Sequence, residues 1–257
     1  MGTFALPAAF FLGLIAGSFA NVVIYRVPKG MSIVRPGSAC PSCGHTLTWY
    51  ENVPVASYVL LGGRCRACKE PISPRYLAVE LVMGAAWVLV TTRIGIHPEL
   101  PAFLWFASVL VVLSVVDLQT RRIPNKILGP CAAVSVGLLA AGAAFWSNLG
   151  PLANAGAGIF LYGLPMLGLA VAVPAGMGMG DVKLAAYLGM HLGWLSLWHV
   201  AVGAFAGFFI GAVAGIAVMA INGKGRKQTI PFGPAMAAGA GLALFAGSPI
   251  LKIWLGF

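Results

Sequence analysis

The chain has 257 residues, of which 60% are hydrophobic and only 9% are charged, and its mean hydropathy is +0.92. A soluble domain carries roughly a quarter charged residues, so this composition excludes an ordinary soluble protein and indicates a polytopic membrane protein. The net charge of +10 does not indicate nucleic-acid binding, because in a membrane protein the distribution of Lys and Arg is more informative than their sum. We therefore expect an all-α fold in a lipid bilayer, with no nucleic-acid partner.

Apolar runs of about twenty residues, the length of a helix that crosses a bilayer, recur along the whole sequence. The first run has no Lys or Arg before it and no small-residue cleavage site after it, so we expect a retained span and not a cleaved signal peptide. A turn inside the region 182–221 is predicted from His191, Gly193 and Trp194 alone. We predict about eight spans, at residues 4–25, 77–96, 100–117, 127–146, 155–174, 182–199, 200–221 and 235–256.

Basic residues concentrate in the loops on one predicted face of the membrane. Of the 16 Lys and Arg residues, 14 fall in these loops, and only Arg93 and Lys252 fall elsewhere. The positive-inside rule makes this face cytoplasmic, which places both ends of the chain outside. The 14 residues are Arg26, Lys29, Arg35, Arg64, Arg66, Lys69, Arg75, Arg121, Arg122, Lys126, Lys183, Lys224, Arg226 and Lys227.

One polar segment, residues 26–76, separates a first transmembrane helix (1–25) from a transmembrane bundle (77–257). The segment is too short for a large core and needs a staple. It contains two CxxC pairs with 21 residues between them, a spacing typical of zinc sites. Four thiolates can close a tetrahedral zinc site of structural type, and a cytoplasmic loop argues against disulfides. Redox chemistry and unmetallated thiols are the alternatives for Cys40, Cys43, Cys65 and Cys68.

Carboxylates are scarce, with six acidic residues in the chain, and only two of them are aspartates. Asp117 lies at the polar end of one predicted span, and Asp181 lies at the start of another, in the sequence Gly178-Met179-Gly180-Asp181. An ionisable group at such a place is a functional-site hypothesis, and two carboxylates held close share a proton. One carboxyl group can then act as general base on a water while the other donates to a carbonyl oxygen.

The alternative is that the two aspartates are unrelated. Each would then cap a helix or pair with a nearby cation, Arg121 or Arg122 for Asp117 and Lys183 for Asp181. Sequence physics alone leaves both interpretations open.

Several other residues have structural interpretations. Glycines at every fourth position from 203 to 215 indicate a helix face that packs closely against another helix. Cys131 is expected to be a small buried hydrophobe. His45, His97, His191 and His199 form no Ser/His/Asp set that competes with the aspartates, and we expect them to be structural.

Six motifs in this order resemble those of the prepilin peptidases, the bifunctional leader peptidase and N-methyltransferase enzymes of the GxGD class of intramembrane aspartyl proteases. The resemblance covers almost the whole chain. The motifs are Gly17–Pro28, the two CxxC pairs, Ser73–Tyr76 leading to Glu80, Asp117 with Arg121–Asn125, Gly178–Lys183, and Ile230–Pro234.

The resemblance implies a membrane endopeptidase of the bacterial cytoplasmic (inner) membrane. In that family Asp117 and Asp181 would hydrolyse the peptide bond after the glycine that ends the basic leader of a type IV prepilin or a type II secretion pseudopilin. The new N-terminal residue, often phenylalanine, would then be methylated with S-adenosylmethionine. No Rossmann-like glycine fingerprint is present, and Glu80 and Asn21 are candidates for this second site. Helix-end pairing for Glu80 and interhelical hydrogen bonding for Asn21 are their structural alternatives.

Two other functions fit parts of the pattern. A proton-coupled transporter would use Asp117 and Asp181 as proton relays, and it would place them near the bilayer midplane within inverted repeats. A zinc-stapled membrane scaffold would have no catalytic role for either residue.

Overall fold

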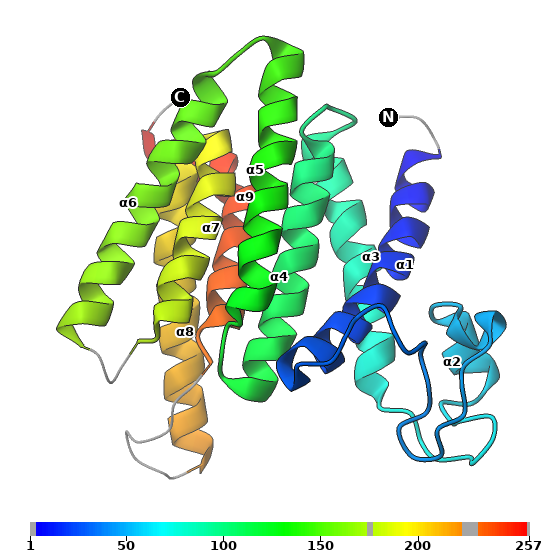
Figure 1. Cartoon of the computed structure of the whole chain (residues 1–257). Helices are drawn as coiled ribbons and strands as arrows, with labels where there is room; N and C mark the ends of the chain where they lie inside the picture. Colours follow the sequence, from blue (N-terminus) through cyan, green and yellow to red (C-terminus); the bar gives the residue numbers. More distant parts are fainter. Residues whose placement is uncertain (1–3, 174–176, 223–230, 256–257) are drawn as a thin grey trace. The chain divides into compact units, whose positions relative to one another are not determined.

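The computed structural model describes residues 4–173, 177–222 and 231–255, and for 222 and 248–255 it describes the backbone alone. It divides into two compact units, Met1–Val112 and Leu113–Phe257, and the division falls inside helix α4 (Leu100–Thr120). The described residues form helices and no β-strand beyond two isolated bridges, so the all-α fold is confirmed (Figure 1). Four residues used above, Lys224, Arg226, Lys227 and Ile230, lie outside the described ranges.

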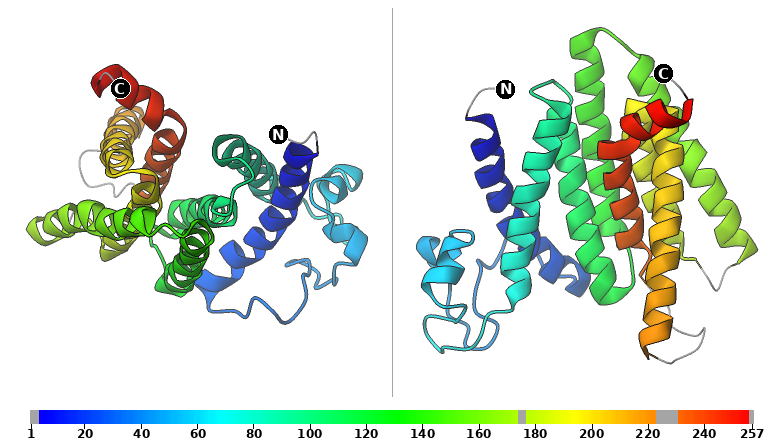
Figure 2. Two further views of the ribbon diagram at one scale, coloured as in Figure 1. Left: turned by 90° about the horizontal axis from the view of Figure 1, so that it is seen from above. Right: turned by 180° about the vertical axis from the view of Figure 1, so that it is seen from behind.

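Unit 1 is built on the helices α1 (Ala5–Arg26) and α3 (Pro74–Ile94), which lie side by side (Figures 1 and 2). Glycines allow their backbones to approach closely. A Cβ atom at Gly13 would lie 2.8 Å from Cα of Gly84, and one at Gly17 would lie 2.7 Å from Cα of Glu80. This close packing fixes the first turns of α3 against the last turns of α1.

The polar segment between α1 and α3 contains little regular structure. Its short helices are η1 (Val27–Lys29), η2 (Trp49–Asn52) and α2 (Ala56–Leu60). The buried Arg26 guanidinium donates to the carbonyl oxygens of Ser32, Pro36 and Gly37, at 3.1, 2.7 and 2.9 Å. These three bonds fix the start of the segment to the end of α1.

Unit 2 contains the rest of α4 and five further helices: α5 (Asn125–Trp146), α6 (Gly150–Ala172), α7 (Met179–Leu195), α8 (Leu197–Asn222) and α9 (Gly233–Leu255). Small residues again set the closest contacts. Gly158 of α6 faces Gly189 of α7, and α8 faces α9 through the glycine repeat. The predicted packing role is thus confirmed for Gly203, Gly207 and Gly211.

Eight long helices coincide with the eight predicted spans, but the number of membrane crossings is not confirmed. Six of the described helices, namely α1, α3, α4, α5, α6 and α8, are long and apolar enough to cross a bilayer. The other two helices are shorter as apolar segments: α7 has 17 residues, and the apolar part of α9 is Gly233–Gly247. The chain is therefore a multi-pass membrane protein.

The predicted break between the sixth and seventh spans, after residue 199, is wrong. Helix α7 ends at Leu195, Ser196 is extended, and α8 begins at Leu197. The hydroxyl oxygen of Ser196 accepts the N–H of His199 at 3.3 Å, so Ser196 caps α8 and His199 belongs to its first turn.

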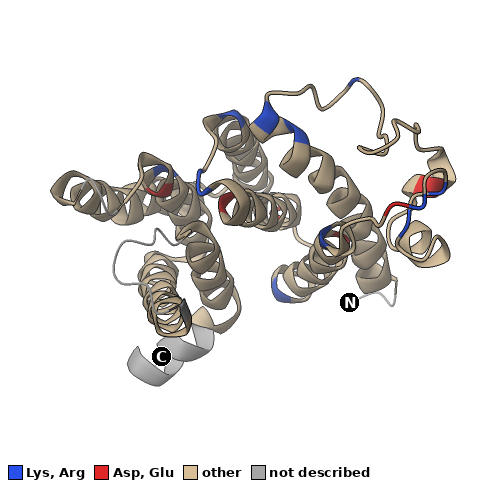
Figure 3. Ribbon diagram, turned by 90° about the horizontal axis from the view of Figure 1, so that it is seen from below, with Lys and Arg blue, Asp and Glu red and all other residues tan. Residues whose placement is uncertain are grey.

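Helix ends that carry charged residues gather at one end of unit 2. There α4 ends and α5, α7 and α9 begin (Figure 1). Figure 3 views the molecule toward this end, with basic residues in blue and acidic residues in red. This arrangement places Asp117, in the last turn of α4, and Asp181, in the first turn of α7, at the same end of the unit.

Candidate functional site

Asp117 is buried against the first residue of α9. Its side chain is 4% exposed, and its Oδ2 atom accepts the N–H of Gly233 at 2.9 Å. A Cβ atom at Gly233 would lie 2.8 Å from that same oxygen, so only glycine leaves room for the carboxylate. The N-terminus of a helix carries unpaired N–H groups and a positive partial charge, which favour a carboxylate there.

Asp181 is the third residue of α7 and is partly exposed. Its Oδ2 accepts the N–H of Gly178 at 3.3 Å, so it folds back on the start of its own helix. Within the described residues neither aspartate forms an ion pair with Arg121, Arg122 or Lys183. Asp181 therefore caps the start of its own helix, as one of the alternatives predicted. The predicted ion pairs are absent from the described part of the chain.

The loop between α4 and α5 joins the segments that carry the two aspartates. A Cβ atom at Gly180 would lie 3.0 Å from Cβ of Ile123, and Lys183 Nζ donates to Asn125 Oδ1 at 3.0 Å. These contacts hold the start of α7 against the loop that directly follows Asp117. The carboxyl groups of Asp117 and Asp181 consequently lie close enough for a Coulombic interaction.

Such an arrangement suits general acid–base chemistry. Mutual repulsion disfavours two ionised carboxylates at short range, so the pair tends to hold one proton. One carboxylate can then take a proton from a water while the other carboxyl group gives a proton to the substrate.

The second site lies in the polar segment of unit 1, where the two CxxC pairs form matching turns. In each turn the N–H of the first cysteine donates to the carbonyl oxygen five residues later, from Cys40 to His45 at 2.9 Å and from Cys65 to Glu70 at 2.8 Å. The residue four positions after the first cysteine has positive φ in both turns, +74° at Gly44 and +61° at Lys69. The segment is thus an internal repeat of two turns, which sequence inspection missed.

The four cysteine sulfur atoms have the spacing of a closed zinc site. All four lie within 4.8 Å of one another, with Cys40 and Cys68 separated by 3.8 Å and Cys43 and Cys65 by 3.9 Å. With Zn–S bonds of about 2.3 Å, tetrahedral geometry separates sulfur atoms by about 3.8 Å. The N–H groups of Cys43 and Ser42 lower the pKa of the Cys40 thiol to about 6, which favours the thiolate. The set could therefore hold zinc.

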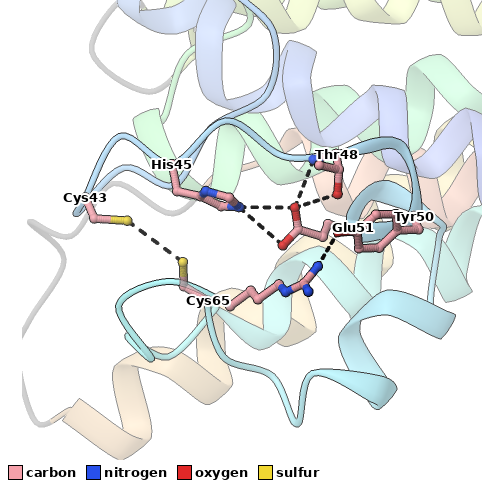
Figure 4. A network of polar contacts seen from close by, with 7 residues as sticks. Cys43, His45, Thr48, Tyr50, Glu51 and Cys65 are labelled. Carbon is pink, nitrogen blue, oxygen red and sulfur yellow. Dashed lines mark hydrogen bonds and ion pairs between the residues drawn. The ribbon is translucent and has the colours of Figure 1, made fainter.

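A polar network ties the first turn to η2 (Figure 4). Glu51 is 7% exposed and accepts from the N–H and the hydroxyl of Thr48, at 2.9 and 2.7 Å, and it pairs with His45 at 3.1 Å. Arg66, from the second turn, contacts Tyr50. The sequence contained the signal for this network, because Thr48 and Glu51 have the Thr-x-x-Glu spacing of a capping box.

Asn21 and Glu80 lie on facing helices of unit 1. Asn21 of α1 donates from Nδ2 to the carbonyl oxygen of Tyr76 in α3 at 3.0 Å, and Glu80 of α3 accepts the N–H of Val55 at 2.8 Å. The interhelical hydrogen bond expected for Asn21 is therefore present. Glu80 contacts the polar segment at a helix end, because Val55 is the N-cap residue of α2.

The remaining candidates have structural contacts. His191 is buried and bonds through Nδ1 to the carbonyl oxygen of Tyr187 at 3.1 Å, and His199 bonds to Ser196 Oγ at 2.7 Å. The contact that sequence reasoning missed altogether is the N–H of Gly233, which no side-chain pattern reveals.

Comparison with known proteins identifies the family. Residues 11–94 match the profile described as the bacterial peptidase A24 N-terminal domain, and residues 104–220 match that of the type IV leader peptidase family. Relatives named prepilin leader peptidase/N-methyltransferase include one from Bacillus subtilis, 35% identical over 97% of this chain and 98% of its own length. The relative from Burkholderia pseudomallei is 35% identical over 95% of this chain and 86% of its own length.

No solved structure matches the chain. The family profiles cover both units, and the relatives align with nearly all of the sequence. The chain therefore belongs to the type IV leader peptidase family.

Proposed function

We propose that this protein is a membrane aspartyl endopeptidase that removes the leader peptide of type IV prepilins and pseudopilins and methylates the new N-terminal residue. Asp117 and Asp181 carry the hydrolysis. The observation that supports this assignment most directly is the docking of the Ile123–Asn125 loop on the start of α7, which brings the two carboxyl groups within Coulombic reach of each other.

Hydrolysis proceeds by general acid–base catalysis. One carboxylate takes a proton from a water, whose oxygen attacks the scissile carbonyl carbon, while the other carboxyl group donates its proton to the carbonyl oxygen. The C–N bond then breaks as the first carboxyl group passes the proton it took from water to the leaving amine. The new carbonyl group forms as a hydroxyl proton of the intermediate returns to the second carboxylate. The Gly233 N–H holds the Asp117 carboxylate in place throughout by its hydrogen bond to Oδ2. The other oxygen, Oδ1, is left for the water.

The position of the pair fits a substrate with a basic leader in the cytoplasm and an apolar helix in the bilayer. Asp117 lies three residues before the end of α4 and Asp181 in the first turn of α7, so both lie near the ends of apolar helices and away from their midpoints. A proton-relay transporter requires the opposite placement. The basic loops at this end favour its placement on the cytoplasmic side, and we assign the protein to the bacterial inner membrane.

The polar segment of unit 1 supplies the second half of the function. Cys40, Cys43, Cys65 and Cys68 would hold a structural zinc ion with no open coordination position, which stabilises a segment that has almost no core of its own. S-adenosylmethionine supplies the methyl group for the N-methyltransferase reaction.

The test is leader cleavage by purified Asp117→Asn and Asp181→Asn variants in detergent. Each substitution is isosteric and should reduce cleavage of a prepilin at least about 100-fold, because it removes a general acid or base. Glu70→Gln, which removes an exposed carboxylate from the polar segment, is the control and should cleave normally. Persistent cleavage by both aspartate variants would refute the mechanism.

A further inference from the structure

Unit 1 contains a buried group of hydrogen-bond acceptors between α1 and α3 that peptide hydrolysis does not use. Asn21 is 2% exposed and Glu80 is 9% exposed. The amide nitrogen of Asn21 bonds to Tyr76, which orients Oδ1 away from that bond and leaves it buried with no donor among the described residues. Buried carbonyl oxygens are seldom left unpaired in native proteins, so this one calls for an explanation.

Glu80 adds a negative charge to the same place without a matching cation. Its Oε2 accepts the N–H of Val55 at 2.8 Å, and the Ser18 side chain of α1 lies near its carboxylate. No Lys, Arg or His of the described residues lies within ion-pair distance of it. A buried carboxylate is costly unless a cation or several donors satisfy it.

The polar segment is held over this carboxylate in a strained conformation. Val55 has φ +62° and ψ −52°, and the N–H of Ala56 bonds to the carbonyl oxygen of Pro54 at 2.6 Å, which makes a γ-turn of the rare positive-φ type. A β-branched residue seldom adopts this conformation. The strain aims the Val55 N–H at Glu80, and strain of this kind is concentrated at binding and catalytic sites.

We propose that Asn21 Oδ1 and the Glu80 carboxylate bind a positively charged group of the methyl-transfer reaction. The inference rests on the methyltransferase activity proposed above. That reaction offers two such groups, the α-ammonium of the newly cleaved chain and the sulfonium of S-adenosylmethionine. A site with acceptors only and a net negative charge matches the positive charge of either group, and the ammonium adds hydrogen-bond donors that could reach both Asn21 and Glu80.

Equilibrium binding to the intact protein in detergent tests the proposal and distinguishes the two groups. One arm compares S-adenosylmethionine with S-adenosylhomocysteine, which lacks the methyl group and the charge. The other compares a peptide that begins with a free phenylalanine amine with its N-acetylated form. Glu80→Gln keeps the shape of the side chain and removes its charge, and Glu70→Gln is the matched control on an exposed carboxylate.

Glu80→Gln should weaken binding of at least one cationic ligand about tenfold or more, because hydrogen bonds to charged groups contribute the most. Binding of its neutral counterpart should change much less. A loss confined to S-adenosylmethionine assigns the site to the sulfonium, and a loss confined to the peptide assigns it to the ammonium.

Equal binding of all ligands by the wild type and Glu80→Gln would overturn the proposal, and so would equal losses for charged and neutral ligands. Asn21→Leu provides a second variant if Glu80→Gln does not fold, with the same expectations. Because binding is measured without leader cleavage, failure of the Asp117 and Asp181 mechanism is scored in its own assay and is not confused with failure here.

Discussion

The carboxylate of Asp117 and the main-chain N–H of Gly233 meet across 116 positions of sequence, at 2.9 Å. Gly233 begins α9, so the aspartate of one helix occupies the N-terminus of another. The contact depends on the absence of a side chain at position 233, where a Cβ atom would meet three atoms of Asp117 at 2.8 to 3.4 Å. In the proposed mechanism Gly233 would act on catalysis by positioning Asp117.

Gly233→Ala should displace the Asp117 carboxylate and strongly reduce cleavage. The new methyl group cannot coexist with the carboxylate in its present place, and a misplacement of about 1 Å in a catalytic group lowers the rate about 100-fold. The measurement is the rate of leader cleavage at saturating and limiting prepilin concentration. The loss should appear mainly in kcat, because the chemistry and not substrate binding is disturbed.

Gly241→Ala is the matched control for this substitution. Gly241 lies in the same helix, and a Cβ atom there would meet nothing within 4 Å. Its variant should cleave at the wild-type rate and unfold at a temperature no lower than the wild type, since alanine favours the helix. A Gly233→Ala protein as active as Gly241→Ala would contradict the positioning role.

The aspartates could be found from sequence because acidic residues are so scarce in this chain. Asp117 and Asp181 stand out at the ends of apolar runs, where a carboxylate has few structural reasons to be. The partner of Asp117 could not be found in this way. A main-chain N–H is common to every residue except proline, and only the fold determines which one is aimed at the carboxylate.

Helix boundaries, too, could be predicted from the sequence only in part. Apolar runs located the eight long helices of the described residues, six of which are long and apolar enough to cross a bilayer. The break was predicted from His191, Gly193 and Trp194 and placed after residue 199, whereas it falls at Ser196. The N–H and the imidazole of His199 both bond to the hydroxyl of Ser196, a capping serine three residues earlier. Hydropathy does not register a cap of this kind.

Removal of one cysteine ligand should abolish zinc binding. Cys40→Ser leaves three thiolates and no closed tetrahedral site. Purified wild-type protein should therefore contain one equivalent of zinc and the variant none, measured by mass spectrometry of the metal. Cys131→Ser is the control, because Cys131 lies in α5 and outside the cluster. Equal zinc content in the two variants would exclude the four-cysteine site.

The two cysteine turns should respond differently to exchange of their positive-φ residues. Gly44→Lys places a side chain at φ +74° and should destabilise the folded segment by about 1 kcal/mol, the usual cost of that conformation. Lys69→Gly relieves the same strain at φ +61°. It should destabilise the folded segment by about 1 kcal/mol at most, the cost of the extra backbone entropy that a glycine loses on folding. Zinc release to a competing chelator measures both effects, and a larger loss for Lys69→Gly would refute the equivalence of the turns.

The Glu51 network should make the polar segment sensitive to acid. The N–H of Thr48, then its hydroxyl, and His45 lower the pKa of the Glu51 carboxyl group from its ordinary value of 4.5 to about 2. Because the folded-state pKa lies below the ordinary value, the ionised carboxylate stabilises the segment above pH 4.5. That contribution is lost as the pH falls from 4.5 toward 2.

The difference in unfolding temperature between the wild type and Glu51→Gln should therefore be constant at neutral pH and shrink between pH 4.5 and pH 2. Protonation of the cysteine ligands affects both proteins alike and cancels in the difference, and Glu70→Gln controls for removal of a carboxylate as such. A difference that stays constant down to pH 2 would show that Glu51 stabilises the segment by its shape alone.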